Sequence, residues 1–571
     1  MKKDLDSLVH ELAALRDEKA RDADEINRLR DLNNFKEHEK RYKARCVCNG
    51  SPNRRGTVTM AETYASSLEQ TGSRIFWAAT AIDNHIVIGA DASNAFAEAP
   101  PPKAPLYVYL DQQFREWWTH KGYPPIHQSH KVMRVKKALQ GHPESPRLWA
   151  QLIHKIITKL GFTPCHHEPC LYVNNDYKGH KIYFLCQVDD FAVSAPEKNL
   201  AEQVISDINS KLTVNIRSLG VITRFNGVDI AQTKNFIKVY NKTYIEKILK
   251  GKNWLEASIP GQYSPQYIPM HNDIEFNKNI ENATPIPPLE LKSVEKEMGF
   301  SYKQGIGELI YALVTCRPDI SFPLIKLSQY STKPARLHFE AVKGIYQYLK
   351  DTKHEGIHYW RSKQSKDLPT APNPTTRTDY NTYKQDPCKI TSQPNVTHIQ
   401  VDASYASDSV HRKSVTGVAA FLAGGCILYK TRFQDVIALS STEAEFIAAC
   451  EAGKNSLYIR SILQDIGIEQ TNATIIYEDN QAAIAMANAG KPTKRTKHID
   501  TRHFALQSWV EQDLVQLERV PTNDNSSDAL TKNTPRVLFN RHSDYLLGRT
   551  IPQYAPVYTS EPPTTTQRGI L

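Results

Sequence analysis

The sequence predicts an α+β protein with several domains, and two observations support this fold class. The chain has 571 residues, and a typical domain has roughly 100–200. Short runs rich in β-branched and aromatic residues, such as HIVIGAD, KIYFLCQVDDFAVSA and FIKVY, alternate with stretches of helical periodicity, such as PRLWAQLIHKIITKLGF. Strands and helices mixed in this way are typical of α+β domains.

The first predicted element is a charged helix over residues 1–40. Leucines recur there at heptad spacing: Leu5, Leu8, Leu12 and Leu15. Lys19 and Asp22 then occupy the positions where the apolar seam should continue. The pattern leaves two structures open, a solvated helix and a coiled coil through which two copies of the chain would self-associate.

Changes in composition then predict the domain boundaries. We expect an α+β region over residues 41–260 and a helix-rich region over 261–360. Residues 361–397 hold Pro, Thr, Asn and Ser with few large apolar side chains, which predicts a flexible linker. Strand and helix patterns alternate again over 398–534, and the Pro- and Thr-rich end, 535–571, is predicted to be a largely disordered tail.

Composition argues against a disulfide-rich or membrane-spanning protein. The nine cysteines are odd in number and lie in apolar contexts, so we expect reduced thiols. No run of about 18 apolar residues is present, and the N-terminal segment is charged throughout. We therefore expect a cytoplasmic protein with no membrane partner. The net charge of +10 is compatible with a polyanionic partner without establishing one.

A first group of acids lies among apolar strands. The run HIVIGAD delivers Asp91, and Asp189 and Asp190 sit side by side between two apolar runs in KIYFLCQVDDFAVSA, as at the tip of a hairpin. Adjacent carboxylates repel one another unless a cation neutralises them, and divalent metals prefer oxygen ligands. A lone Asp-Asp pair is usually a solvated turn, but the apolar flanks and the third acid on another strand favour a two-metal site for phosphoryl transfer.

A second group of acids follows the predicted linker, each at the end or the start of an element: Asp402, Glu443, Asp479 and Asp528. Strand ends and helix starts that converge in this way are a recurrent arrangement in two-metal nucleases. Glu443 and Glu445 are two residues apart on a predicted helix and point to different faces, so we expect only one of them, Glu443, to face the metals. Any one of these acids alone would be an ordinary surface carboxylate.

These motifs occur together, in this order, in one family. The chain resembles the reverse transcriptase and ribonuclease H portion of the Pol polyprotein of copia-type LTR retrotransposons, over about residues 41–534. The matching segments include RYKARCVCNG (41–50), ADASNAF (90–96), KKALQGHPESPRLW (136–149), QVDDFAV (187–193), VDASYASDSVHRKSVTG (401–417), ALSSTEAEF (438–446), YEDNQAAI (477–484) and DALTK (528–532).

The resemblance implies a right-hand polymerase followed by a ribonuclease H-like α/β domain with a mixed sheet. Fingers and palm would occupy residues 41–260, and thumb and connection 261–360. The two groups of acids would be catalytic, and each would bind two Mg²⁺ ions, with Mn²⁺ as an alternative. The implied partners are an RNA template, a DNA primer, deoxynucleoside triphosphates and RNA–DNA hybrids. The implied location is the cytoplasm, in virus-like particles, with access to the nucleus.

The resemblance also implies a nucleotide-binding set: Phe96, Gln140, Gly141, Lys43 and Arg45. Phe96 would lie beneath the sugar and exclude a 2′-OH, although it is also compatible with a core aromatic. Gln140 and Gly141 would lie against the incoming nucleotide and template. Lys43 and Arg45 would meet the triphosphate, although a solvated basic strand fits them equally well.

Two features of the sequence need separate interpretation, and one alternative function stays open. The family usually has Tyr before Val-Asp-Asp, whereas this chain has Gln187. The segment from Cys165 to Cys170, CHHEPC, contains residue types that bind metals. A structural zinc site would need a second pair of ligands nearby, and none is evident, so we interpret these side chains as packed residues and not as metal ligands. The alternative function is a decayed or repurposed remnant that binds nucleic acid without catalysis.

Overall fold

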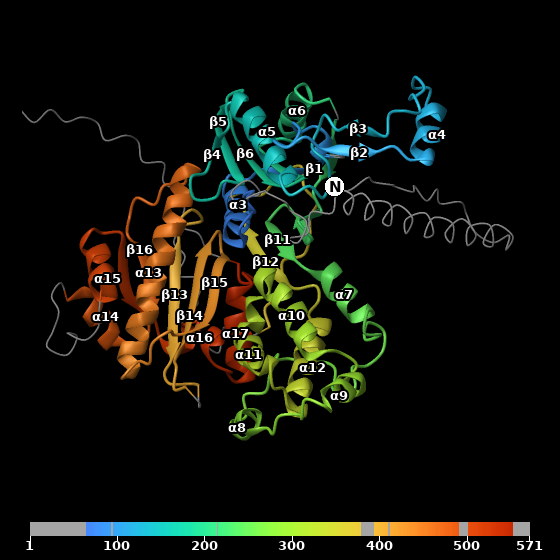
Figure 1. Ribbon diagram of the computed structural model, residues 1–571. Helices are drawn as coiled ribbons and strands as arrows, with labels where there is room; N and C mark the ends of the chain where they lie inside the picture. Colours follow the sequence, from blue (N-terminus) through green and yellow to red (C-terminus); the bar gives the residue numbers. More distant parts are fainter. Residues whose placement is uncertain are drawn as a thin grey trace, which may run out of the picture. The chain divides into compact units, whose positions relative to one another are not determined.

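The computed structural model describes residues 64–92, 95–213, 215–377, 393–408, 411–489 and 501–551, with side chains from residue 505 on in the last range (Figure 1). The chain forms two compact units. Within the described residues, unit 1 comprises Asp91–Phe162 and Ile205–Arg217, together with residues 64–67, and unit 2 comprises Leu68–Ala90, Thr163–Val204 and residues 218–551. The positions of the chain's parts relative to one another are not determined, so each unit is described by itself.

Unit 1 is built on helix α5 (Ser145–Lys159). Its apolar positions recur at helical spacing and bury Leu148, Trp149 and Ile153. The short 3-10 helix η2 (Ala95–Ala97) packs against α5. The strands β2 (Tyr107–Tyr109) and β3 (Val132–Arg134) pair antiparallel, and helix α4 (Gln112–His120) lies between them in the chain.

The first part of unit 2 is a sheet with the strand order β4-β5-β6-β7-β1-β8. Its strands are β1 (Ile86–Ala92), β4 (Thr163–Pro164), β5 (Leu171–Tyr177), β6 (His180–Gln187), β7 (Asp190–Ala195) and β8 (Ile216–Val221). Helix α3 (Gln70–Ile82) contacts this sheet through β6, and α6 (Lys198–Asn209) follows β7. Almost every residue of β1 is buried, which explains why its sequence is a continuous apolar run rather than an alternating one.

A smaller sheet and a helical layer follow. The sheet has the order β12-β11-β10-β9, with β9 (Arg224–Phe225), β10 (Val228–Gln232), β11 (Phe236–Tyr240) and β12 (Gly356–Trp360). The helices are α7 (Lys242–Lys250), α8 (Ile274–Asn282), α9 (Leu291–Met298), α10 (Tyr302–Cys316), α11 (Ser321–Ser328) and α12 (Arg336–Asp351). Because β12 pairs with β11, the chain returns to this sheet after the helices.

The C-terminal part is a mixed five-stranded sheet of order β15-β14-β13-β16-β17. The strands are β13 (His398–Ser404), β14 (Val415–Leu422), β15 (Gly425–Phe433), β16 (Thr474–Glu478) and β17 (Val515–Arg519). The helices are α13 (Ser441–Asp465), α14 (Gln481–Asn488), α15 (Thr501–Glu511), α16 (Asp528–Thr531) and α17 (Arg536–Leu546). The pairs among β13, β14 and β15 are antiparallel, and β16 is parallel to both its neighbours. Long helix α13 packs across β13 and β14 (Figure 1). The predicted mixed sheet is confirmed.

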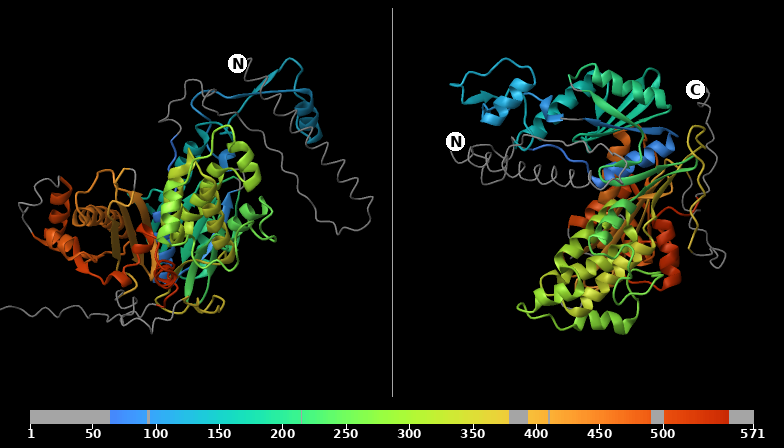
Figure 2. Two further views of the ribbon diagram at one scale, coloured as in Figure 1. Left: turned by 90° about the horizontal axis from the view of Figure 1, so that it is seen from below. Right: turned by 90° about the vertical axis from the view of Figure 1, so that its right-hand side faces the viewer.

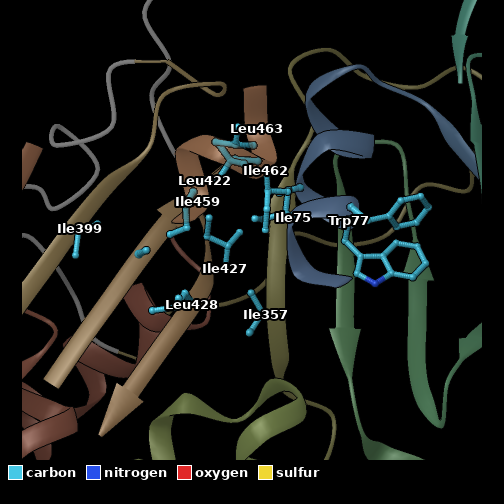
Figure 3. Packing of buried hydrophobic residues seen from close by; sticks show 14 of the residues in the cluster. Ile75, Trp77, Ile357, Ile399, Leu422, Ile427, Leu428, Ile459, Ile462 and Leu463 are labelled. Carbon is cyan, nitrogen blue, oxygen red and sulfur yellow. The ribbon is translucent and has the colours of Figure 1, made fainter. Parts of the chain in front are cut away.

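The C-terminal sheet shares an apolar core with α3 and with the smaller sheet of unit 2. Ile75 and Trp77 on α3 and Ile357 on β12 belong to the same buried cluster as Ile427 on β15 and Ile462 on α13 (Figure 3). Helix α11 also contacts β15 and α16, and the yellow-green helices lie beside the orange and red C-terminal part in Figures 1 and 2. Within unit 2 the C-terminal sheet is therefore packed against the preceding elements rather than only tethered to them.

The predicted linker and tail are partly structured. Of the linker, residues 378–392 lie outside the described residues, but Arg361 at its start is buried and donates to the carbonyl oxygens of Thr233 and His85. The tail begins with helix α17, in which Leu546 is fully buried. The prediction of a largely disordered tail is therefore wrong for α17, and residues 552–571 lie outside the described part. None of the described helices is long and apolar enough to cross a membrane.

Candidate functional site

Three carboxylates of the C-terminal sheet lie close enough to share a metal ion. Asp402 lies on β13, and Asp479 directly follows β16. These strands are parallel neighbours, paired from His398 with Ile475 onward, so both acids come to the same edge of the sheet. Glu445 reaches this edge from the first turns of α13, and one oxygen of each of the three residues lies within 4.8 Å of those of the other two.

The third member is Glu445 and not the predicted Glu443. The backbone N–H of Glu443 donates to Ser440 Oγ at 3.1 Å, and its Oε2 accepts from the Leu439 N–H at 2.7 Å. Glu443 therefore caps the start of α13. Glu445 is buried. Of the two glutamates, Glu445 lies in this group and the predicted Glu443 does not, because a capping residue three positions after the N-cap turns back toward the helix start.

Asp528 joins the group from α16. It is buried, and the Nζ atom of Lys532 lies 3.0 Å from Asp528 Oδ1 and 3.7 Å from Asp402 Oδ1. Thr531 Oγ1 also donates to Asp402 Oδ2. The structure thus brings three of the four acids predicted here, Asp402, Asp479 and Asp528, to one place.

A fifth acid, Glu478, was missed by the sequence analysis. It is fully buried at the end of β16, next to Asp479. Strand alternation could have found it, because Thr474, Ile476 and Glu478 fall on one face of β16 and all three are buried. An acid on the buried face of a strand requires an explanation that a surface acid does not.

The electrostatics of the group are unfavourable without a cation. Burial, followed by the charges of Glu478 and Asp402, raises the pKa of Glu445 far above its ordinary value. Burial also raises the pKa of Glu478, and burial together with Asp402 raises that of Asp528. Burial alone would lower the pKa of Lys532, but Asp402 and Asp528 beside it raise it.

The donor set fits a divalent metal. Within the part of the chain that the structure describes, Glu445 Oε2 and Glu478 Oε2 are buried and have no hydrogen-bond partner. Such oxygens are costly when left alone, and a hard cation such as Mg²⁺ takes oxygen ligands. Asp402, Glu445 and Asp479 could hold the ion directly, with Asp528 adjacent to Asp402.

The predicted hairpin tip at Asp189 and Asp190 is present in unit 2. Gln187 pairs with Asp190 across the ends of β6 and β7, so Val188 and Asp189 form a two-residue turn. Val188 has a φ of 55° and is 41% exposed, a conformation that a β-branched residue adopts only when the surroundings enforce it. Gln187 Oε1 accepts from the backbone N–H of Leu68 at 2.9 Å, so Gln187 holds the segment that leads into α3.

The remaining predicted residues lie in unit 1 or outside the described residues. Asp91 is half-buried on β1, between the buried Ala90 and Ala92, and Phe96 is half-buried in η2. Gln140 and Gly141 are the central residues of a turn closed by the His142 N–H and the Leu139 carbonyl at 3.1 Å, with Gly141 at φ 83°. Because Asp91 belongs to unit 1, its position relative to Asp189 and Asp190 is not determined. Lys43 and Arg45 lie outside the described residues.

Residues of the CHHEPC segment form hydrogen bonds with Asp465. Cys165 is buried, and its Sγ donates to Asp465 Oδ2 at 3.0 Å, while the His166 N–H donates to the same oxygen at 2.8 Å. Burial raises the pKa of Cys165. In the described ranges the segment contributes no group of three or more ligands close enough together to hold a metal.

Comparison with known proteins shows what the chain is similar to. Residues 26–271 match the family described as "Reverse transcriptase (RNA-dependent DNA polymerase)". This segment, less than half of the chain, is therefore similar to that family. The chain is also similar to the "Retrovirus-related Pol polyprotein from transposon TNT 1-94" of Nicotiana tabacum, at 26% identity over 501 residues, which are 87% of this chain and 33% of the relative. The predicted resemblance to a retrotransposon Pol polyprotein is confirmed.

Two further similarities extend this result. The "Retrovirus-related Pol polyprotein from transposon RE1" of Arabidopsis thaliana is 24% identical over 499 residues, 87% of this chain and 30% of the relative. The chain thus spans about a third of the length of these relatives. Among solved structures, LC11-RNase H1, isolated from compost, covers 24% of this chain and 93% of its own length at 13% identity, with a TM-score of 0.20. A structural similarity this low supports no conclusion about the acidic site.

Proposed function

We propose that the chain is the reverse transcriptase and ribonuclease H portion of a copia-type retrotransposon Pol polyprotein. It copies RNA and DNA templates into DNA from a primer and deoxynucleoside triphosphates, and it hydrolyses the RNA strand of RNA–DNA hybrids. The observation that carries the hydrolytic half is the group of buried carboxylates formed by Asp402, Glu445, Asp479 and Asp528. The match of residues 26–271 to the reverse transcriptase family supports the polymerase half.

The carboxylate group suits metal-assisted hydrolysis of a phosphodiester. Bound divalent ions would supply a nucleophile at neutral pH and neutralise charge on the scissile phosphate. The protein's own contribution is to hold the oxygens of Asp402, Glu445 and Asp479 at one edge of a rigid sheet. Thr531 and Lys532 orient Asp402 by direct contacts. Lys532 also offsets part of the negative charge of Asp402 and Asp528, so that the group is tolerable before a metal binds.

At the polymerase site we propose that Asp91, Asp189 and Asp190 hold the metals. The hairpin turn at Val188 and Asp189 supports this proposal, because it presents the Asp189 side chain at an exposed tip. The proposed nucleotide contacts are Phe96, Gln140, Gly141, Lys43 and Arg45. Mg²⁺, with Mn²⁺ as an alternative, is the proposed ion at both sites. We further propose that the protein acts in the cytoplasm, in virus-like particles.

The deciding experiment compares two neighbouring glutamates. Glu445→Gln should reduce Mg²⁺-dependent cleavage of a labelled RNA–DNA hybrid by at least about a thousandfold, since a metal ligand would be lost. Glu443→Gln, the matched control two residues away, should retain cleavage within a few fold, because it changes only a helix cap. Equal loss in both variants, with both folded, would contradict the assignment of Glu445. Hybrid binding without cleavage by the wild type would favour the alternative of a non-catalytic remnant.

A second substitution separates the two activities. Asp189→Asn should abolish primer extension on an RNA template, because a ligand of the polymerase metals would be lost, while hybrid cleavage at the C-terminal sheet should persist. Gel assays of both reactions on one preparation would measure this. Loss of both activities in a folded Asp189→Asn protein would show that the two sites are not independent.

A further inference from the structure

Residues 107–137 of unit 1 form a projecting segment, here called the aromatic arm. It consists of β2, helix α4, a loop, and β3, which pairs with β2 through Tyr107 and Arg134. Figure 1 shows α4 at the far end of the ribbon formed by β2 and β3. No residue of α4 is buried, so the helix is not part of a hydrophobic core.

The arm is nevertheless braced internally. Asp111 Oδ1 caps α4 by accepting from the Phe114 N–H at 2.7 Å, and Gly122, at φ 79°, ends the helix in the left-handed region. Arg115 donates to the carbonyl oxygens of Ile126 and His127, both at 3.2 Å. These contacts hold the loop against the helix, so the arm has a defined shape.

The braced helix presents aromatic rings to solvent. Trp118 lies 4.6 Å from Tyr123 and 5.8 Å from Phe114, centroid to centroid, and its Nε1 donates to the Pro124 carbonyl at 2.9 Å. Trp117 and Tyr123 are each 49% exposed. Large aromatic residues that are exposed and clustered, rather than single, mark interaction surfaces.

The same arm is basic. Residues 107–137 contain six Arg and Lys against two Asp and Glu. The two acids have local partners: Asp111 caps α4, and Glu116 accepts from Gln112 Nε2 at 3.0 Å. The exposed cations are Lys121, Lys131, Arg134, Lys136 and Lys137. Exposed rings beside exposed cations suit a ligand that has both flat aromatic faces and a line of negative charges.

We propose that the aromatic arm binds single-stranded nucleic acid, by stacking bases on Trp117 and Tyr123 and by contacting phosphates with Lys121, Lys131, Arg134 and Lys136. Unpaired bases offer their faces for stacking, whereas a duplex hides them. The charge of the arm complements the phosphate backbone. The inference rests on the proposed function only in that the chain acts on nucleic acid, and it requires neither metal nor catalysis.

The test measures binding of the full chain to a labelled single-stranded oligonucleotide of about 20 nucleotides by fluorescence anisotropy, in EDTA. The double variant Trp117→Leu/Tyr123→Leu should bind at least about tenfold more weakly, because base stacking is lost. Trp117→Phe should keep most of the affinity, since it retains a ring. Tyr263→Leu, at a tyrosine that is 87% exposed outside the arm, is the matched control and should bind like the wild type.

A salt titration tests the phosphate contacts. Lys131→Gln/Lys136→Gln should lower the slope of log affinity against log salt by about 0.7 for each contact removed. The inference is overturned if the aromatic double variant, shown to be folded by circular dichroism, binds the oligonucleotide like the wild type. It is also overturned if the wild type does not bind a single strand, or if the double variant loses only self-association or binding to anionic vesicles. Binding by the arm in a chain that lacks primer extension would refute the proposed function and leave the inference standing.

Discussion

At the scale of single residues, spacing alone could not choose between two glutamates of one motif. Glu443 and Glu445 both lie in the first turns of α13. Helical periodicity shows that their side chains point to different faces of the helix, but it does not show which face is turned toward Asp402 and Asp479. The structure decides this, because Ser440 and Leu439 engage Glu443 while Glu445 lies with Asp402 and Asp479. Glu478 could not be identified from spacing either, because it belongs to the acidic group only through its burial, and the assembled sheet creates that burial.

Buried histidines lead to a prediction at this scale. Burial lowers the pKa of His398, and its Nε2 lies 2.8 Å from the Tyr545 hydroxyl, with its ring stacked on Phe421. A histidine with a lowered pKa in the folded state stabilises the protein above its unfolded pKa, and this contribution is lost as the pH falls from about 6.5. The free energy of unfolding should therefore fall by about 2 kcal/mol for this residue between pH 7.5 and pH 5.

His398→Phe checks that prediction by urea unfolding at the two pH values. Phe keeps the stacking on Phe421 but cannot be protonated, so the difference in unfolding free energy between pH 7.5 and pH 5 should shrink by about 2 kcal/mol. His120→Phe, at an exposed position, serves as the control and should leave the difference unchanged. An unchanged pH dependence in His398→Phe would mean that His398 does not titrate differently in the folded state.

At the scale of elements, helix α17 is the main departure from expectation. The segment RVLFNRHSDYLL precedes a Pro- and Thr-rich end, and the composition of that end led to the prediction that residues 535–571 form a disordered tail. In the structure, Tyr545 and Leu546 join a buried cluster with Phe421 and Leu530. The helix is explained by the sheet face that it covers and not by its own propensity.

Substitution in α17 tests this dependence. Leu546→Ala should lower the free energy of unfolding by about 2–5 kcal/mol, because Leu546 is fully buried and its removal leaves a cavity. Val537→Ala, in the same helix but 57% exposed, should change it by no more than about 0.5 kcal/mol. Equal small effects in chemical unfolding experiments would show that α17 is not docked in solution.

At the scale of the whole chain, unit 2 joins elements that the sequence analysis assigned to separate domains. Arg74 on α3 is a buried connector: its guanidinium donates to the carbonyl oxygens of Thr315 at 3.2 Å and Ile427 at 3.5 Å, and to the Tyr429 hydroxyl at 2.9 Å. It also lies 4.3 Å from the centre of the Tyr429 ring. One side chain therefore contacts the end of α10 and the strand β15 together.

Arg74→Met should disturb both partners at once. The apolar side chain leaves buried carbonyl groups without a donor, which should cost about 2–4 kcal/mol of unfolding free energy. Amide hydrogen exchange should rise both at the C-terminal end of α10 and in β15. Arg519→Met, at an exposed position on the edge strand β17, should alter neither segment. Faster exchange confined to α3 would contradict the coupling.

The family resemblance implied the mixed C-terminal sheet. The sequence patterns by themselves determined the α+β class, the hairpin at Asp189 and Asp190, and three of the five acids at the C-terminal sheet. These features depend on local patterns: strand alternation, apolar flanks and the placement of acids at element ends. Only the tertiary structure decided that Glu445 replaces Glu443, that Glu478 is buried beside Asp479, that α17 is folded, and that the C-terminal sheet shares an apolar core with α3 and β12. Each of these depends on contacts between segments far apart in the chain, and burial created by such contacts leaves no periodic signal in either segment alone.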